Sequence, residues 1–92
     1  MESRENVYGH LNRERDYQES LKPNWCPNWT PSIAEELVLA EEYLNRAKHA
    51  WSTIYGDLKA GLNELRSVAA ICVRCFENHG FIERADAPRK SK

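Results

Sequence analysis

The sequence lacks the marks of a secreted or membrane-spanning protein. Residues 1–6 carry charges and no apolar stretch follows them, so we expect no signal peptide. No segment approaches the roughly 20 consecutive apolar residues of a membrane-spanning helix. The three cysteines are an odd number, and two of them lie within a helical pattern, which does not suit a secreted disulfide framework. We therefore expect a protein of the reducing cytoplasm.

The chain also lacks an excess of charge of either sign. Its 13 basic and 14 acidic residues leave a net charge of −1, which excludes a general attraction to nucleic acid or to a membrane surface. Glycine-rich phosphate loops, internal repeats and low-complexity tracts are absent as well. Residues 83–92 are locally basic and are expected to form a flexible tail. With 92 residues, the chain is expected to form a single helical domain, 1–92, of marginal stability by itself.

Helical periodicity is the main feature that the sequence does have. Residues 4–21 carry a weak apolar stripe at helical spacing, which predicts a short amphipathic helix. Residues 22–31 contain three prolines, so a loop is expected there. This loop also holds Trp25 and Trp29, whose indoles we expect to pack over the end of the core.

A long helix is predicted over residues 32–55. Two competing signals mark its start: Thr30-Pro31, a capping hydroxyl before proline, and Ser32 with Glu35, a capping box. Apolar residues then recur at alternating spacings of four and three, which is typical of an a/d seam that packs on another helix. The members of this seam are Ile33, Leu37, Ala40, Leu44, Ala47, Trp51 and Ile54.

A second long helix is predicted over residues 57–79. Tyr55-Gly56-Asp57 separates it from the first, because glycine suits a helix end and aspartate suits a cap. Gly80 is expected to cap its C-terminus, with Phe81 folding back onto the last turn. Its apolar residues repeat at the same spacings and are Leu58, Leu62, Leu65, Ala69, Cys72 and Phe76.

The short connection between the two long helices predicts an antiparallel hairpin and hence an all-α fold. Within the second helix, residues 68–73 are six apolar residues in succession. A helix that is apolar all round is buried on all sides. The short first helix and the tryptophan loop can cover only part of this run. We therefore expect a homo-oligomer, a dimer or higher, that forms a multi-helix bundle.

Cysteine offers one candidate for chemistry. Cys72-x-x-Cys75 and His79 place three soft ligands along one side of a helix, and Cys26 could supply a fourth ligand to zinc. The favoured interpretation is core packing, because Cys72 lies in the apolar seam and a buried free cysteine behaves as a small hydrophobe. A redox role is disfavoured, because the pair lies toward a helix C-terminus, where the dipole does not lower a thiol pKa.

Carboxylates offer a second candidate, a magnesium site. Magnesium that handles a nucleotide is held by one or two carboxylates together with phosphate oxygens. Such a site would require Glu64 of the second long helix to face the acidic residues of the first long helix across the hairpin. The alternative is that these carboxylates are solvated on exposed helix faces. The acids of the first long helix are Glu35, Glu36, Glu41 and Glu42.

Basic and aromatic residues offer a third candidate, an anion site. Arginine pairs bidentately with phosphate, and an aromatic face can stack on any base. The alternative is ordinary salt-bridging at the surface. The residues concerned are Arg66, Arg74, Lys48 and His79, with Trp51 or Tyr55 for stacking.

Over residues 13–80 the chain resembles small phage and prophage proteins that are grouped with the MazG-like, all-α nucleoside triphosphate pyrophosphohydrolases. The resemblance rests on four short patterns and a Trp-Thr pair that opens a helix. The patterns are Glu14-Arg15-x-x-Gln18, Tyr-Leu-x-x-Ala-x-x-Ala-Trp over 43–51, Gly56-Asp57, and Leu-x-x-x-Arg-x-Val-Ala-Ala from Leu62 running on to Glu77-x-His79-Gly80.

This resemblance implies helical oligomers, a nucleotide ligand and magnesium held by acidic residues. The active enzymes use Glu-Glu-x-x-Glu on one helix and Glu-x-x-Asp on a following helix. Here Asn45 follows Glu41-Glu42 in place of the third acid, and Ser67 follows Glu64 in place of the aspartate. Two missing carboxylates weaken magnesium binding and charge neutralisation at the phosphates.

We therefore expect a non-catalytic protein without a cofactor that binds a nucleotide or a nucleotide-derived signal between subunits. A counter-defence role in the host cytoplasm fits a phage protein of this size. The ligand-binding residues expected are Arg66, Arg74, Trp51, His79 and Lys48.

Two other functions stay open. One is a magnesium-dependent nucleoside triphosphate pyrophosphohydrolase, in which Glu42 and Glu64 hold the metal. The other is an inhibitor that applies a helix face, or the loop with Trp25 and Trp29, to a host protein.

Overall fold

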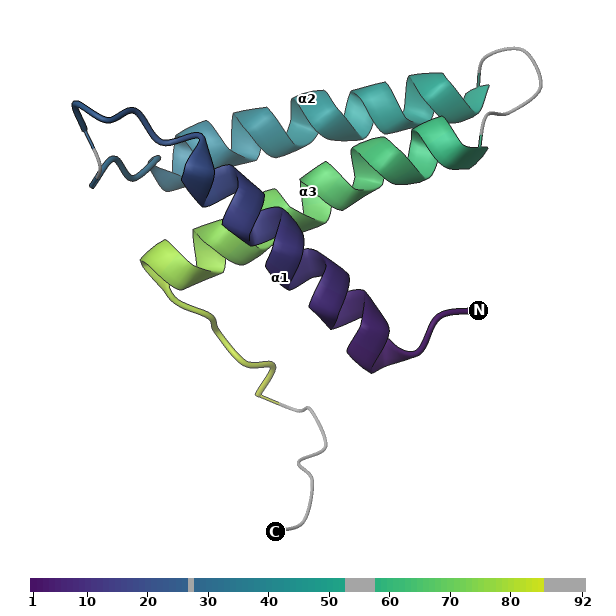
Figure 1. Ribbon diagram of the computed structural model, residues 1–92, viewed down its shortest axis with the longest axis horizontal. Coiled ribbons are helices and arrows are strands. Elements are labelled where there is room, and N and C mark those ends of the chain that lie inside the picture. The colour runs from purple at the N-terminus through teal and green to yellow at the C-terminus, as the bar shows by residue number, and fades with distance from the viewer. Residues whose placement is uncertain (27, 53–57, 86–92) are drawn as a thin grey trace, which may run out of the picture.

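The structure, a computed structural model, describes residues 1–26, 28–52 and 58–85, and they form three α-helices (Figure 1). They are α1 (Arg4–Ser20), α2 (Ile33–Ser52) and α3 (Leu58–His79). No strand occurs among these residues, so the predicted all-α class is confirmed. Over the same residues, none of the helices combines the length and the apolar character needed to cross a bilayer.

Local side-chain signals set the ends of the helices. The Ser32 hydroxyl accepts from the Glu35 N–H at 3.1 Å, and the Glu35 carboxylate accepts from the Ser32 N–H at 2.9 Å. The capping box is therefore the signal that starts α2. The competing signal at Thr30 does not act, because its hydroxyl donates to the Asn28 carbonyl at 3.2 Å instead.

The predicted C-cap of α3 is confirmed. Gly80 has a φ of +103°, a backbone conformation that favours glycine, and its N–H donates to the Phe76 carbonyl at 2.9 Å. The Phe81 ring folds back against the Phe76 ring, edge to face, with centroids 4.9 Å apart. The predicted break at 55–57, the seam residue Ile54 and most of the predicted tail lie outside the described residues.

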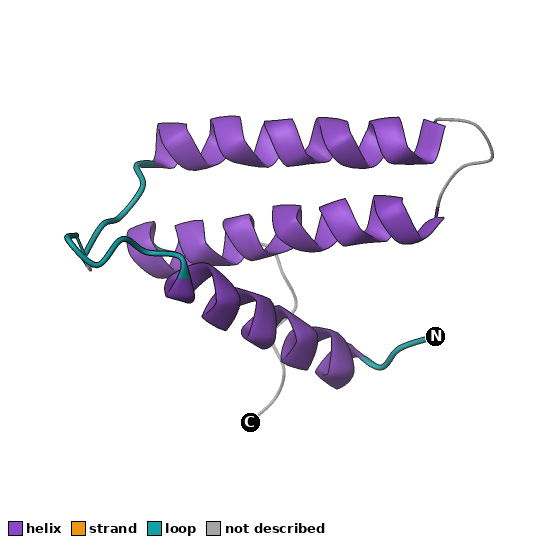
Figure 2. Ribbon diagram, turned by 45° about the horizontal axis from the view of Figure 1, so that its top comes forward, coloured by secondary structure: helices purple, strands orange, loops and turns teal. Residues whose placement is uncertain are grey.

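α2 and α3 pack side by side as an antiparallel hairpin, as predicted, and α1 crosses α3 near the end where α2 begins (Figures 1 and 2). Both views show α1 diverging from the hairpin toward its own N-terminus. Within the described residues, α1 packs against α3 and makes no such contact with α2. The hairpin is therefore covered by α1 along one helix only.

The interior of the single subunit is small. Apart from Pro31, its buried apolar side chains among the described residues are Ala47, Ala70 and Ile71. The predicted position of the seams is wrong for their large members, which keep 43–65% of their surface exposed. We call these eight residues the hairpin face: Ile33, Leu37, Leu44 and Trp51 on α2, and Leu58, Leu62, Leu65 and Phe76 on α3.

The physical reason lies in which line of α2 faces α3. The buried or half-buried line runs through Glu36, Ala40, Tyr43 and Ala47. It shares the two alanines with the predicted seam and is turned by about 50° from the mean direction of the described members of that seam at 3.6 residues per turn. A charged residue, Glu36, begins this line. Periodicity of apolar residues alone therefore predicts the small members of the contact and misplaces the large ones.

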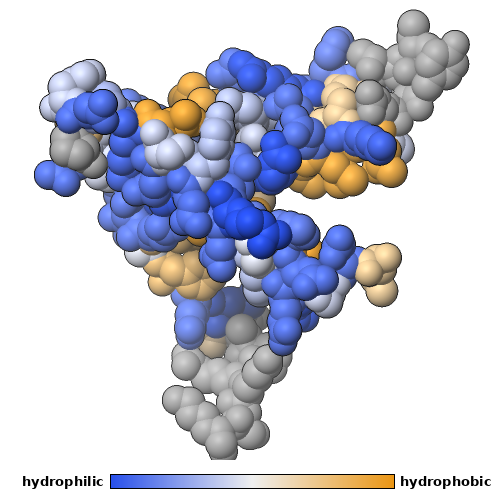
Figure 3. Space-filling model, in the orientation of Figure 1, coloured by the Kyte–Doolittle hydropathy of each residue, from blue (hydrophilic) through white to orange (hydrophobic). Residues whose placement is uncertain are grey.

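The apolar run 68–73 is only partly enclosed by the single subunit, as predicted. Ala70 and Ile71 are buried, whereas Cys72 is exposed. The cover that the prediction expects from a second copy stays a prediction. α2 and α1 each cover one side of α3, which leaves the side of Cys72 open. Figure 3 shows apolar surface on the side of the hairpin that faces the gap between its tip and α1.

Candidate functional site

Arg74 is enclosed in the hairpin. Its Nε and Nη2 donate to the two carboxylate oxygens of Glu36 at 2.7 and 2.6 Å, and only 2% of Glu36 is exposed. The Trp29 ring lies over the guanidinium, 6.0 Å from its carbon. This geometry argues against the predicted role of Arg74 in binding a phosphate, because its donors are already directed at a carboxylate. It also removes Glu36 from the acids that could hold a metal.

His79 serves the loop. Its Nε2 lies 2.9 Å from the carbonyl oxygen of Pro31, which ties the last turn of α3 to the segment before α2. Together with the Arg74–Glu36 pair, this contact fixes where α2 starts relative to where α3 ends. His79 is thus engaged at the same end of the hairpin as Arg74.

The three cysteines do not form a metal site with His79. No group of three or more His, Cys, Asp or Glu side chains in the described part of the chain is placed to hold a metal ion. Cys72 is exposed, which overturns its predicted packing in the core. Partial burial, with smaller contributions from Cys75 and Glu36, raises the pKa of the Cys72 thiol. A protonated thiol is a poor metal ligand and a poor nucleophile.

Arg66 lies at a groove between α1 and α3 of about 530 Å³. Its Nε is 3.1 Å from a Glu14 carboxylate oxygen, and its Nη2 donates to the Asn63 side-chain oxygen at 2.7 Å. His10 and Lys59 line the same groove, over a floor of apolar side chains. Lys59 forms no ion pair with any residue that the structure describes. The floor consists of Val7, Leu11, Leu62, Leu65 and Ala69.

Lys59 and His10 are not among the ligand residues predicted from the sequence. A usable signal was present for Lys59, because it precedes Arg66 by seven residues and the two therefore share a side of α3. No such signal was present for His10, since its position depends on the angle at which α1 crosses α3.

Lys48 and Trp51 line a different groove, of about 250 Å³, between α2 and α3. Leu62 and Leu65 line both this groove and the one with Arg66, so the two grooves adjoin. The five predicted ligand residues are therefore spread over three places. Arg66 stands in one groove, Lys48 and Trp51 in the next, and Arg74 and His79 at the loop end of the hairpin.

Glu42 and Glu64 line one open groove of about 520 Å³ on the hairpin, together with Asn45 and His49. The sequence alone left open whether Glu64 faces the acids of the first long helix. In the structure, Glu64 and Glu42 lie at the same groove. Glu42 accepts from Arg46 Nη2 at 2.8 Å, and this contact is the main cause that raises the pKa of Arg46. A cation would thus compete with Arg46 for Glu42.

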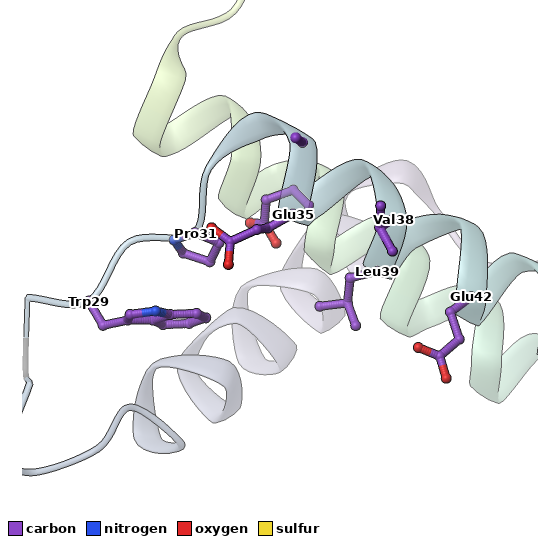
Figure 4. Close-up of a pocket in the computed structure, with 8 residues that line it drawn as sticks. Trp29, Pro31, Glu35, Val38, Leu39 and Glu42 are labelled. Atoms are coloured by element: carbon purple, nitrogen blue, oxygen red, sulfur yellow. The ribbon is translucent and has the colours of Figure 1, made fainter.

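A further groove, of about 450 Å³, lies where the loop meets α2 (Figure 4). Trp29, Pro31 and Leu39 form apolar walls, and the carboxylates of Glu35 and Glu42 stand near them. Hydrogen bonds from Ser32 lower the pKa of Glu35, so this carboxylate stays ionised. Trp25 is 85% exposed, so its predicted packing over the core is wrong.

Arg15 anchors α1 and was not singled out as an anchor from the sequence. Its Nε and Nη2 donate to the two carboxylate oxygens of Glu77 at 2.8 and 3.0 Å. It also donates to Gln18 at 3.0 Å and to Glu19 at 3.1 Å. Of the residues quoted for the family resemblance, Glu14, Arg15 and Glu77 thus form contacts between α1 and α3, and Gln18 accepts from Arg15 within α1.

The chain was compared with protein-family models, with curated proteins and with solved structures, and no match was found in any of the three.

Proposed function

We propose that this chain is a self-associating, non-catalytic helical binding protein whose ligand is a nucleotide or a nucleotide-derived signal. The observation that carries self-association is the hairpin face, eight large apolar side chains that remain about half exposed. The buried apolar residues in the described part of the chain are two alanines, an isoleucine and a proline, which is little apolar surface for a domain that is stable alone. Joining copies along this face forms the multi-helix bundle.

The α1–α3 groove supports the choice of ligand. Lys59 supplies positive charge at its rim, and His10 supplies a ring nitrogen. Arg66 adds a second cation, since it remains exposed beside Glu14, unlike the buried Arg74. The part of the floor outside the hairpin face, which is Val7, Leu11 and Ala69, suits a base or another flat ring, and arginine suits a phosphate. Asn45 and Ser67 stand where the family that the chain resembles has acids, which favours binding over hydrolysis. A phage protein that sequesters a signal nucleotide is a role consistent with this chemistry.

Two measurements test the proposal. Light scattering of the purified chain gives the mass in solution, and we expect a dimer or higher oligomer. Calorimetry against a panel of nucleotides, including cyclic and ADP-ribose-like species, tests the ligand. Arg66→Ala should weaken binding by about tenfold or more, as expected when a charged hydrogen bond is lost. Arg4→Ala, an exposed change outside the groove, is the matched control. Absence of binding at high micromolar concentration would remove the ligand proposal.

One observation favours a second candidate, magnesium-dependent hydrolysis of a nucleoside triphosphate to a monophosphate and pyrophosphate. Glu42 and Glu64 line the same groove, as metal-holding carboxylates from two helices must. The test is release of pyrophosphate that requires magnesium and is lost in Glu64→Gln. Glu41→Gln is the control, because Glu41 does not line that groove. Release that persists in Glu64→Gln would point to a contaminant.

A further inference from the structure

The middle residue of the hairpin face on α2 and the middle residue on α3 lie at the same height along the hairpin. Glu36 lies opposite Arg74, and Ala47 lies opposite Gly61, where an added Cβ would meet the Ala47 carbonyl oxygen at 3.8 Å. Interpolation between these two contacts places Leu44 of α2 level with Leu65 of α3. Both leucines belong to the hairpin face and are exposed.

Each of these leucines stands midway between two residues of the exposed side. On α2, Leu37 and Trp51 lie seven residues before and after Leu44. On α3, Leu58 and Cys72 lie seven residues before and after Leu65. Consider a two-fold axis that lies in the hairpin face, runs across both helices and passes Leu44 and Leu65. Rotation by 180° about this axis places Leu37 against the partner's Trp51. It likewise places Leu58 against the partner's Cys72. The face therefore has the spacing of a surface that is complementary to itself.

Charge follows the same symmetry. Glu41 and Lys48 flank Leu44 along one edge of α2, seven residues apart, and both are exposed. Neither forms an ion pair with any residue in the described ranges. The same rotation brings Glu41 against the partner's Lys48 and Lys48 against the partner's Glu41. Both residues occupy the same heptad position, and in an antiparallel pair of helices such positions meet each other.

We infer that the occupant of the hairpin face is a second copy of this chain, packed antiparallel, α2 on α2 and α3 on α3, about a two-fold axis at Leu44 and Leu65. This inference rests on the proposed self-association and specifies its geometry. Eight side chains exposed at about half of their area present roughly 800 Å² in all, which is what each partner of a standard interface buries. The product is a four-helix core with α1 of each copy beside its own α3.

Charge reversal at the two edge positions tests this arrangement. Glu41→Lys and Lys48→Glu should each replace two attractive pairs per dimer by repulsive ones. We expect each to raise the dimer dissociation constant about tenfold or more, as measured by sedimentation equilibrium. Combining the two reversals restores opposite charges across the axis, and the dissociation constant should return to within about threefold of the wild-type value. Asp16→Lys, a reversal at an exposed position on α1, is the control.

A disulfide trap tests the axis itself. In a background with Cys26, Cys72 and Cys75 changed to serine, Leu44→Cys places a thiol on the axis, next to its own copy. Oxidation should then link two chains, because a disulfide needs Cα atoms about 4.4–6.8 Å apart. Leu37→Cys alone should not link, since its counterpart lies far along the partner helix.

The outcomes separate the two proposals. A wild-type chain that stays monomeric at high concentration overturns self-association and this geometry together. Two results would support self-association but overturn the antiparallel arrangement. One is a dimer whose dissociation constant is unchanged by either single charge reversal. The other is a Leu37→Cys variant that forms the intermolecular disulfide as readily as Leu44→Cys. Helix content by circular dichroism shows that each variant is folded before its mass is compared.

Discussion

Glu36 and Arg74 form a two-pronged ion pair inside the hairpin, at the level of the first turns of α2 and the last turns of α3. The carboxylate stands near the N-terminal end of α2, where the helix dipole favours a negative charge. Because the Trp29 ring lies over the guanidinium, one pair joins the loop and both helices of the hairpin.

Removing one member of this pair should destabilise the fold severely. Glu36→Leu or Arg74→Met leaves a buried charge without its partner, which costs about 3–5 kcal/mol in the free energy of unfolding. Replacing both, as Glu36→Leu with Arg74→Met, should cost much less than the sum of the two single changes. Urea unfolding followed by circular dichroism measures this. Glu42→Gln is the control, since its ion pair with Arg46 is exposed. A single change as mild as that control contradicts the prediction.

The contact between α1 and α3 should weaken in acid. The hydrogen bonds from Arg15 are the main cause that lowers the pKa of Glu77, and Lys22 and Arg15 lower that of Glu19. A carboxyl whose pKa is lower in the folded than in the unfolded chain adds stability that is fully present above the ordinary glutamate pKa. That stability is lost as the pH falls through the lowered folded value.

Urea midpoints measured between about pH 3 and pH 7, across the ordinary glutamate pKa, test this. The wild-type midpoint should fall toward the acid end, and Glu77→Gln should show a shallower fall. Asp16→Asn should keep the wild-type profile, because Asp16 forms no ion pair with the residues described. Identical profiles for wild type and Glu77→Gln would show that the Arg15 contact does not contribute.

The start of α2 offers a matched pair of substitutions. Ser32→Ala removes the hydroxyl that accepts from the Glu35 N–H and should lower the free energy of unfolding by about 1 kcal/mol. Thr30→Ala should change it by far less, because that hydroxyl bonds the loop and not the helix. Equal losses would mean that the helix starts at Thr30-Pro31 in solution.

The end of α3 should be sensitive to any side chain at Gly80. At a φ of +103°, Gly80→Ala is strained although no atom lies within 4 Å of the added Cβ. We expect a loss of about 1–2 kcal/mol in the free energy of unfolding. Gly9→Ala, in the middle of α1, should be neutral or stabilising, since its nearest neighbour is the flexible tip of Arg13 at 4.0 Å. Thermal unfolding of the two variants separates strain from a general effect of glycine replacement.

The features that could be predicted from the sequence depend on near neighbours along the chain. The Ser32–Glu35 capping box, the Gly80 cap and the return of Phe81 each involve residues within five positions. Helix type and the hairpin follow from periodicity over many residues, so a local error does not change them.

The features that failed depend on contacts between distant residues. The side of α2 that faces α3 is set by Glu36, a charged residue that a count of apolar positions passes over, and by Arg74, 38 residues away. The groove at Arg66 depends on the crossing angle of α1, which Arg15 and Glu77 fix across 62 residues. Neither ion pair can be predicted from a single sequence, because each of the 13 basic residues could pair with many of the 14 acidic residues.

The small interior also bears on how this chain tolerates change. In an ordinary domain, exposed positions tolerate substitution and buried positions do not. Here the buried apolar residues Ala47, Ala70 and Ile71 are few and mostly small, and the interior also holds the buried Glu36–Arg74 pair. Because the proposed association covers the exposed leucines of the hairpin face, a library of random variants sorted for intact protein should be depleted at those leucines as well as at the ion pair. Intolerant positions would then occur on the outside of the subunit as well as in its interior.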